Sequence, residues 1–193
     1  MISGTISLLF ALALATAEPP HQDSPDLELA ALLAVLAAEA GQELAFEETR
    51  HSELLAEPLT VSGRLYRDDQ DRLIRITEGR RPETHTLAER YVEIRRADRS
   101  RQRFSLGRAP ELGVLREALL AILDGDAARL KQSFDVELEP DNGDWRLNLV
   151  PLDPDLAERV KRLTLLGSDQ ELTAMSLHLD DDEIIETRFL ERQ

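Results

Sequence analysis

The sequence predicts a single α+β domain in which helices cover one face of a long, curved antiparallel β-sheet. Three observations predict this architecture. An amphipathic helical pattern lies near the start of the chain, the apolar residues then recur with a period of two over roughly sixty residues, and a pair of helical patterns precedes a second alternating series. Alternating segments joined by short polar turns form hairpins, which build an antiparallel sheet. The 193 residues suit one hydrophobic core.

The N-terminal segment has the pattern of a secretory signal peptide. An apolar run from Ile6 to Ala15 is followed by small residues, so we expect cleavage between Ala17 and Glu18 and a mature protein in the periplasm. The segment before the run has no Lys or Arg, which leaves a buried N-terminal helix as the alternative. The run is shorter than the ~20 residues that span a bilayer. These features divide the chain into a signal peptide, a leader and a folded domain at residues 1–17, 18–25 and 26–193.

Capping residues and apolar spacing predict the helices. The first begins at Ser24 and ends near Gly41, and the second begins at Pro110 and ends at Gly125. Asp126 then caps a short helix. Both longer helices carry apolar residues three and four positions apart, so each presents one apolar stripe. The stripes are Leu29, Leu32, Leu33 and Leu36 in the first helix and Leu112, Leu115, Leu119, Ile122 and Leu123 in the second.

Strands are expected where apolar and polar residues alternate between polar turns. Before the second helix, the expected strands start at Leu44, Leu59 and Arg72, and a further pair covers His85–Ile94 and Arg103–Leu106. We interpret the charged stretch Arg95–Arg101 as a solvated hairpin tip. After the helices come a hairpin with its turn at Glu139–Asp144, one or two helical turns from Asp153, and strands near Arg162–Leu166, Leu172–Leu179 and Ile184–Leu190.

Composition and motifs exclude several classes of function. The formal net charge of −15 opposes binding to phosphate backbones, so we expect no nucleic-acid partner. The absence of cysteine removes thiolate chemistry and lipidation at a Cys. The four histidines stand at no metal-ligand spacing, and the sequence offers no assembled nucleophile, phosphate loop or acid–base group. We therefore expect a monomeric protein without metal, cofactor or catalysis.

Several short segments carry a resemblance to a known family. They are Phe46–Arg50, Glu57–Leu59, Ser62–Tyr66 and Arg72–Arg75, followed by Pro110–Leu112, Leu123–Asp126 and Trp145–Leu147. In pattern and order they resemble the LolA family of periplasmic outer-membrane lipoprotein carriers, and specifically its branch encoded beside polyketide or aryl polyene lipid pathways. The resemblance covers most of the mature chain.

The resemblance implies an incomplete β-barrel whose concave, apolar face binds the acyl chains of a lipoprotein or lipid beneath helices that cap its mouth. It also implies an inner-membrane donor and an outer-membrane acceptor. The chain ends at Gln193 directly after a strand, without the additional C-terminal strand and loop of the lipoprotein carriers, which weakens the expectation of that acceptor. The residues expected to line the acyl cavity are Leu32, Leu36, Phe46, Val61, Leu65, Leu73, Leu115, Leu119 and Ile122.

Arg75 is the residue for which the resemblance implies a latch. By its position after the Ser62–Gly63 strand, it corresponds to the family arginine that bonds to lid backbone and holds the empty site closed. Alternation places Arg75 on one face with Leu73 and Thr77, so its side chain lies either in a cavity or on the solvent face, where it would pair with a neighbouring charge.

Two functions remain open on the sequence alone. A soluble carrier must offer apolar area that its own core has not consumed, because each exposed methylene of a lipid chain costs ~0.8 kcal/mol in water. With aromatic residues at only 4%, Leu, Ile and Val would have to supply that area, although helical leucine stripes also form ordinary cores. The alternative is an interaction scaffold for a membrane lipid-biosynthesis pathway, with a fully packed interior.

Overall fold

The computed structural model of the protein describes four stretches of the chain: residues 25–38, 41–53, 56–180 and 182–190. The expected signal peptide and nearly all of the leader, including Ser24 at the expected start of the first helix, fall outside these stretches. Among the helices that the structure describes, none is both long and apolar enough to cross a membrane.

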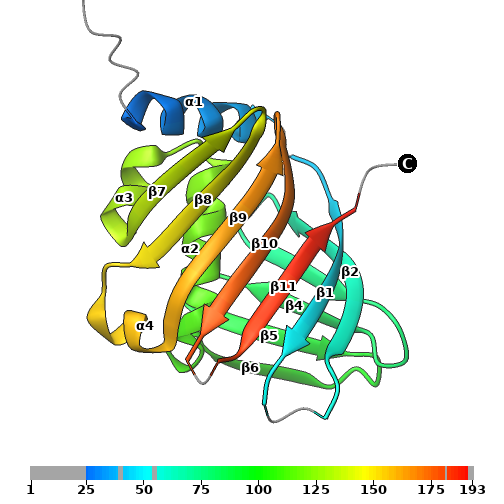
Figure 1. The fold of residues 1–193 in the computed structure, drawn as a ribbon. Helices are drawn as coiled ribbons and strands as arrows, with labels where there is room; N and C mark the ends of the chain where they lie inside the picture. The colour runs from blue at the N-terminus through cyan, green and yellow to red at the C-terminus, as the bar shows by residue number, and fades with distance from the viewer. Residues whose placement is uncertain (1–24, 39–40, 54–55, 181, 191–193) are drawn as a thin grey trace, which may run out of the picture.

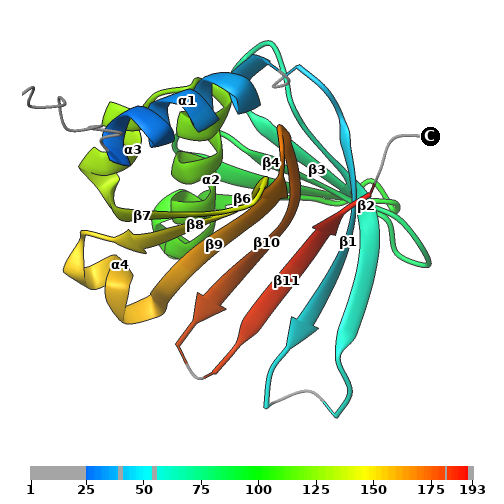
Figure 2. The same ribbon diagram turned by 45° about the horizontal axis from the view of Figure 1, so that its top comes forward.

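Eleven antiparallel strands form one sheet within the described residues, in the order β6-β5-β4-β3-β2-β1-β11-β10-β9-β8-β7. Figures 1 and 2 show this sheet curling around the helices without closing, because β6 and β7 remain as edges. The predicted fold class, an α+β domain with an incomplete barrel, is therefore confirmed. The strands of the N-terminal half are β1 (Leu44–His51), β2 (Leu59–Arg67), β3 (Leu73–Thr77), β4 (Glu83–Leu87), β5 (Tyr91–Arg96) and β6 (Arg101–Ser105). Those of the C-terminal half are β7 (Phe134–Asp141), β8 (Asp144–Pro151), β9 (Val160–Ser168), β10 (Glu171–Leu179) and β11 (Ile184–Phe189).

The two halves of the sheet join where the first and last strands pair. In this register Phe46 of β1 stands opposite Phe189 of β11 and, on its other side, opposite Gly63 of β2. A Cβ at position 63 would overlap the carbonyl oxygen of Ile76 and meet the Phe46 ring, so glycine allows this tight approach. The concave face thus continues across the junction.

The helices lie along the concave side of the sheet. They are α1 (Pro25–Ala38), the short 3₁₀ helix η1 (Leu106–Arg108), α2 (Pro110–Leu123), α3 (Ala127–Ser133) and α4 (Pro154–Arg159). Helix α2 runs inside the curve and contacts β9, and α1 lies over α2 and α3 at one end of the barrel, which we call the mouth (Figure 2). Gly125 makes the corner after α2 with φ of 68°, a left-handed conformation that favours glycine, and Asp126 caps α3 as predicted.

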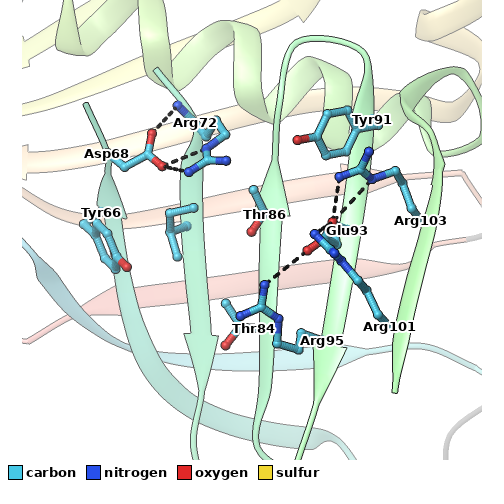
Figure 3. Close-up of a pocket in the computed structure, with 11 residues that line it drawn as sticks. Tyr66, Asp68, Arg72, Thr84, Thr86, Tyr91, Glu93, Arg95, Arg101 and Arg103 are labelled. Carbon is cyan, nitrogen blue, oxygen red and sulfur yellow. Dashed lines mark hydrogen bonds and ion pairs between the residues drawn. The ribbon is translucent and has the colours of Figure 1, made fainter. Parts of the chain in front are cut away.

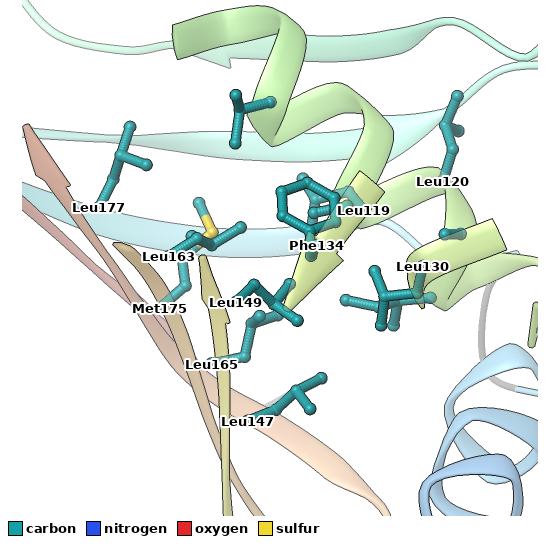
Figure 4. Close-up of a cluster of buried hydrophobic side chains, with 14 of the residues drawn as sticks. Leu119, Leu120, Leu130, Phe134, Leu147, Leu149, Leu163, Leu165, Met175 and Leu177 are labelled. Carbon is teal, nitrogen blue, oxygen red and sulfur yellow. The ribbon is translucent and has the colours of Figure 1, made fainter. Parts of the chain in front are cut away.

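The core fills the space between α2 and the C-terminal strands. Figure 4 shows leucines from β8 and β9 meeting Phe134 and the helical leucines. Leu147, Leu149, Leu163 and Leu165 have no exposed surface, and each alternates with an outward-facing neighbour. On α2 the small residues Ala118 and Ala121 are also fully buried, which lets this helix approach the sheet closely.

The prediction of one strand over His85–Ile94 was wrong. Residues 88–90 form a tight turn between β4 and β5, in which the Ala88 amide donates to the Tyr91 carbonyl over 3.0 Å. The turn contains no Gly, Pro, Asn or Asp, so the signals that mark hairpins were missing. Consequently β5 includes Arg95 and Arg96, and the charged tip is shorter than Arg95–Arg101.

Two other hairpin turns are tighter than expected. The predicted turn Glu139–Asp144 contracts to Asn142 and Gly143, whose φ values of 49° and 100° are typical of the two-residue turn that suits twisted strands. The turn between β9 and β10 contains only residues 169 and 170, and Asp169 there takes a positive φ of 50°. Strand alternation therefore extends farther into both hairpins than the polar residues indicated.

Candidate functional site

A cavity of about 770 Å³ opens at the mouth, between the C-terminal ends of α1 and α2 and strand ends from both halves of the sheet. This volume lies within the range of small-molecule pockets in proteins. The apolar lining residues are Leu36, Leu44, Leu65, Leu73, Leu119, Ile122, Leu123, Leu172, Phe189 and Leu190.

Strand register explains how residues far apart in sequence meet in this cavity. Leu44 of β1 pairs with Leu65 of β2, so both side chains lie on the concave face. Phe189 ends β11 on the same face, and Leu172 comes from the β9–β10 hairpin. Leu36 and Ile122 are buried from the helical side. Hence a wall of aliphatic groups from both halves of the sheet faces the ends of two helices.

The rim of the cavity is polar. It includes Arg67 at the end of β2 and the β9–β10 hairpin from Ser168 to Thr173. Arg67 Nη1 donates to Asp124 Oδ1, the residue that follows α2, over 2.6 Å, and its Nη2 lies 2.6 Å from Asp71 Oδ1. The hydrogen bond to Asp71 is the main cause of a raised Arg67 pKa, with a further contribution from Asp124. Arg67 therefore ties the N-terminal half of the sheet to the end of α2.

The predicted cavity residues divide into two groups. Five of them, Leu36, Leu65, Leu73, Leu119 and Ile122, line the cavity. The other four, Leu32, Phe46, Val61 and Leu115, do not line it. All nine are packed in or against the hydrophobic core. Phe46 fills the space over Gly63, and the α2 stripe is not uniform, because Leu115 precedes Leu119 by one turn and lies deeper along the helix axis. Contact with a ligand stays a prediction for all nine.

Arg75 stands opposite Leu65 on the concave face, but it does not line the mouth cavity. Its Nη2 donates to Glu48 Oε1 over 2.8 Å, and its guanidinium lies 4.8 Å from the centre of the Phe46 ring. The resemblance implied a bond from Arg75 to lid backbone. Among the described residues, its hydrogen bond leads instead to Glu48 on the neighbouring strand β1. Arg67 of β2 instead contacts Asp124, the residue that follows α2.

Sequence reasoning missed the polar rim and five Leu or Phe residues of the lining: Leu44, Leu123, Leu172, Phe189 and Leu190. Leu123 already belonged to the predicted stripe of α2. The others lie at strand ends, where alternation assigns a face but does not reveal which end of the barrel the helices cover. That information depends on the pairing of β1 with β11.

The cavity is suited to burying apolar groups and does not present an arrangement of reactive side chains in its walls. Its walls are aliphatic, and its charged groups stand at the rim. Within the described residues, no group of three or more His, Asp or Glu side chains is placed to hold a metal ion. Such a site can bind hydrocarbon without directional contacts, since apolar burial depends on area.

Comparison with known protein families identifies the class of this protein. Residues 22–187 match the family described as outer membrane lipoprotein carrier protein LolA-like. The chain belongs to this family, and the resemblance noted in the sequence is confirmed. No curated protein matches the sequence.

Solved structures with similar folds are remote in sequence. The LolA superfamily protein NE2245 from Nitrosomonas europaea has a TM-score of 0.40 at 10% identity, over 83% of this chain and 90% of its own. LprF from Mycobacterium bovis has a TM-score of 0.33 at 13% identity, with 86% and 93% covered. The MucA/MucB complex of Pseudomonas aeruginosa matches with a TM-score of 0.38 at 16% identity, over 84% of this chain and 55% of the matched chain.

Proposed function

We propose that this protein is a periplasmic carrier that holds the acyl chains of a lipoprotein or lipid in the mouth cavity and moves them between membranes without catalysis. The observation that carries the proposal is the aliphatic cavity of about 770 Å³ beneath α1 and α2. Membership of the LolA-like family supports the same function. The donor and acceptor would be proteins of the two membranes, and the carrier would act as a monomer.

The energetics of transfer favour such a cavity. When an acyl chain leaves a membrane, each methylene exposed to water costs ~0.8 kcal/mol of free energy. Burial of the chain against leucines removes this cost. Leu190 at the rim is 47% exposed, so part of the apolar wall is available before any ligand binds. Helices at the mouth could enlarge the space by shifting between closed and open arrangements.

The scaffold alternative requires a fully packed interior. The mouth cavity disfavours it, because a core at native density leaves few voids larger than a water molecule. The discriminating property is therefore the uptake of hydrocarbon.

Leucines at the mouth provide the test. We expect the double variant L172Q/L190Q to bind a fluorescent fatty acid at least about tenfold more weakly than the unmodified protein, because two apolar wall residues become polar. The measurement is a fluorescence titration. The control is L59Q/L152Q, which changes two leucines, each 53% exposed, that do not line the cavity.

The control should bind the probe like the unmodified protein. Equal affinities for both double variants, or no uptake by the unmodified protein, would contradict the proposal. Retained binding to partner proteins with no uptake of fatty acid would favour the scaffold.

A further inference from the structure

A second pocket lies on the convex face of the sheet, and Tyr66 lines both this pocket and the mouth cavity. The second pocket has a volume of about 270 Å³ and spans β2 to β6 (Figure 3). Four arginines and two carboxylates line it, which leaves a local net charge of +2 in a protein whose net charge is −15. The positive side chains are Arg72, Arg95, Arg101 and Arg103.

Strand register builds most of this pocket from two cross-strand rows. Tyr66, Ile74, Thr86, Glu93 and Arg103 stand opposite one another on successive strands, from β2 to β6. A second row places Thr84 opposite Arg95 and Arg95 opposite Arg101. Thr84 and Thr86 are short, whereas their neighbours in both rows are long. The surface therefore dips at β4 between tyrosine on one side and arginines on the other.

Glu93 organises the arginines at the floor of the pocket. Its side chain is only 6% exposed, and its Oε2 lies 2.7 Å from Arg101 Nη2 and 2.9 Å from Arg103 Nη2. The contact from Arg95 Nη2 to Oε1 is longer, at 3.5 Å. Arg101 is the main cause that lowers the Glu93 pKa, so the carboxylate stays ionised at neutral pH. One buried negative charge thus fixes three guanidinium groups around a hollow.

The arginines retain the capacity to bind a further anion. Each guanidinium has five N–H donors, and the contacts to Glu93 use one or two of them. The side chains of Arg95, Arg101 and Arg103 are 62%, 57% and 53% exposed, so their other donors face solvent. Arg103 also lies 4.0 Å from the centre of the Tyr91 ring, which holds its plane in place.

Protection of an edge strand does not explain this arrangement. Charged side chains on an edge strand such as β6 prevent pairing with other sheets. That role requires neither a buried glutamate nor a hollow in the surface. Guanidinium groups held around a pocket are instead typical of recognition of phosphate, whose oxygens accept paired N–H donors.

We propose that the convex-face pocket binds a phosphate group, with Arg95, Arg101 and Arg103 as its donors. The net positive charge of the lining complements the negative charge of a phosphate group, and Ile74 and Tyr66 offer apolar contact to the molecule that carries the phosphate. The carrier of the phosphate is either a phospholipid headgroup or a soluble phosphorylated compound.

Titration calorimetry with inorganic phosphate, against chloride at equal ionic strength, tests this site. We expect binding by the unmodified protein and a loss of at least about tenfold in R101Q/R103Q, because charge-assisted hydrogen bonds disappear. The matched control R80Q/R81Q removes two exposed arginines outside the pocket and should retain affinity. If R101Q/R103Q fails to fold, R95Q serves instead, since Glu93 keeps its two shorter contacts; it should bind several-fold more weakly.

Sedimentation with vesicles identifies the source of the phosphate. Binding to vesicles of phosphatidylcholine with phosphatidylglycerol, lost in R101Q/R103Q, would indicate a lipid headgroup, whereas binding of inorganic phosphate alone would indicate a soluble compound. Absence of both interactions in the unmodified protein, or equal affinity in R101Q/R103Q and R80Q/R81Q, would overturn the proposal. Uptake of fatty acid should be unchanged in R101Q/R103Q, so failure here would not touch the carrier function.

Discussion

Glu93 is a buried carboxylate on the convex face whose protonation is coupled to stability. Its pKa lies at about 2, below the ordinary 4.5, because Arg101 and Arg103 stabilise the carboxylate more than burial disfavours it. A carboxylate with a depressed folded-state pKa contributes stability above the unfolded-state pKa and loses it as pH falls toward the folded-state value. The stabilisation by Glu93 is therefore complete at neutral pH and declines between about pH 4.5 and about pH 2.

We expect Glu93→Gln to lower the free energy of unfolding at neutral pH, since the amide cannot replace the charge that the arginines surround. The difference from the unmodified protein should shrink as pH falls through that window. Urea denaturation at a series of pH values measures it. A difference that stays constant down to about pH 2 would show that Glu93 contributes no ionisation-linked stability.

At the scale of elements, the caps and alternation predicted most helices and strands, whereas the turn between β4 and β5 escaped because residues 88–90 lack turn-forming side chains. The cavity was harder to predict. Alternation assigned Leu65 and Leu73 to the concave face, but Phe189 and Leu190 joined them only through the long-range pairing of β1 with β11. The contact of Arg67 with Asp124 likewise joins segments far apart in sequence. Sequence spacing therefore could not show that Arg67, rather than Arg75, makes this contact.

The contact between Arg67 and Asp124 predicts how the mouth opens. It joins β2 to the end of α2 at the cavity rim, so Arg67→Gln should release this link and speed the exchange of a fluorescent fatty acid several-fold, as for the loss of a charge-assisted hydrogen bond. Stopped-flow fluorescence measures the rates. The control is Arg64→Gln on the same strand, whose partners are Glu43 and Glu78 and which does not line the cavity. Identical rates in the two variants would remove Arg67 from the opening step.

At the scale of the whole molecule, two opposite properties coexist. The net charge of −15 keeps the protein soluble through mutual repulsion, while an apolar cavity opens at one end of the sheet. The convex face carries a local positive pocket, so the two faces of one sheet would contact chemically different parts of their surroundings. The unclosed sheet separates these faces, and the helices of the described residues lie on the concave one.

Native mass spectrometry of the protein, purified gently from cells, tests the carrier function most directly. We predict mass additions that correspond to acyl-bearing lipids and that are reduced in L172Q/L190Q but retained in L59Q/L152Q. A spectrum of the unmodified protein that shows the bare polypeptide mass alone, together with no gain in mass after incubation with fatty acid, would contradict a carrier.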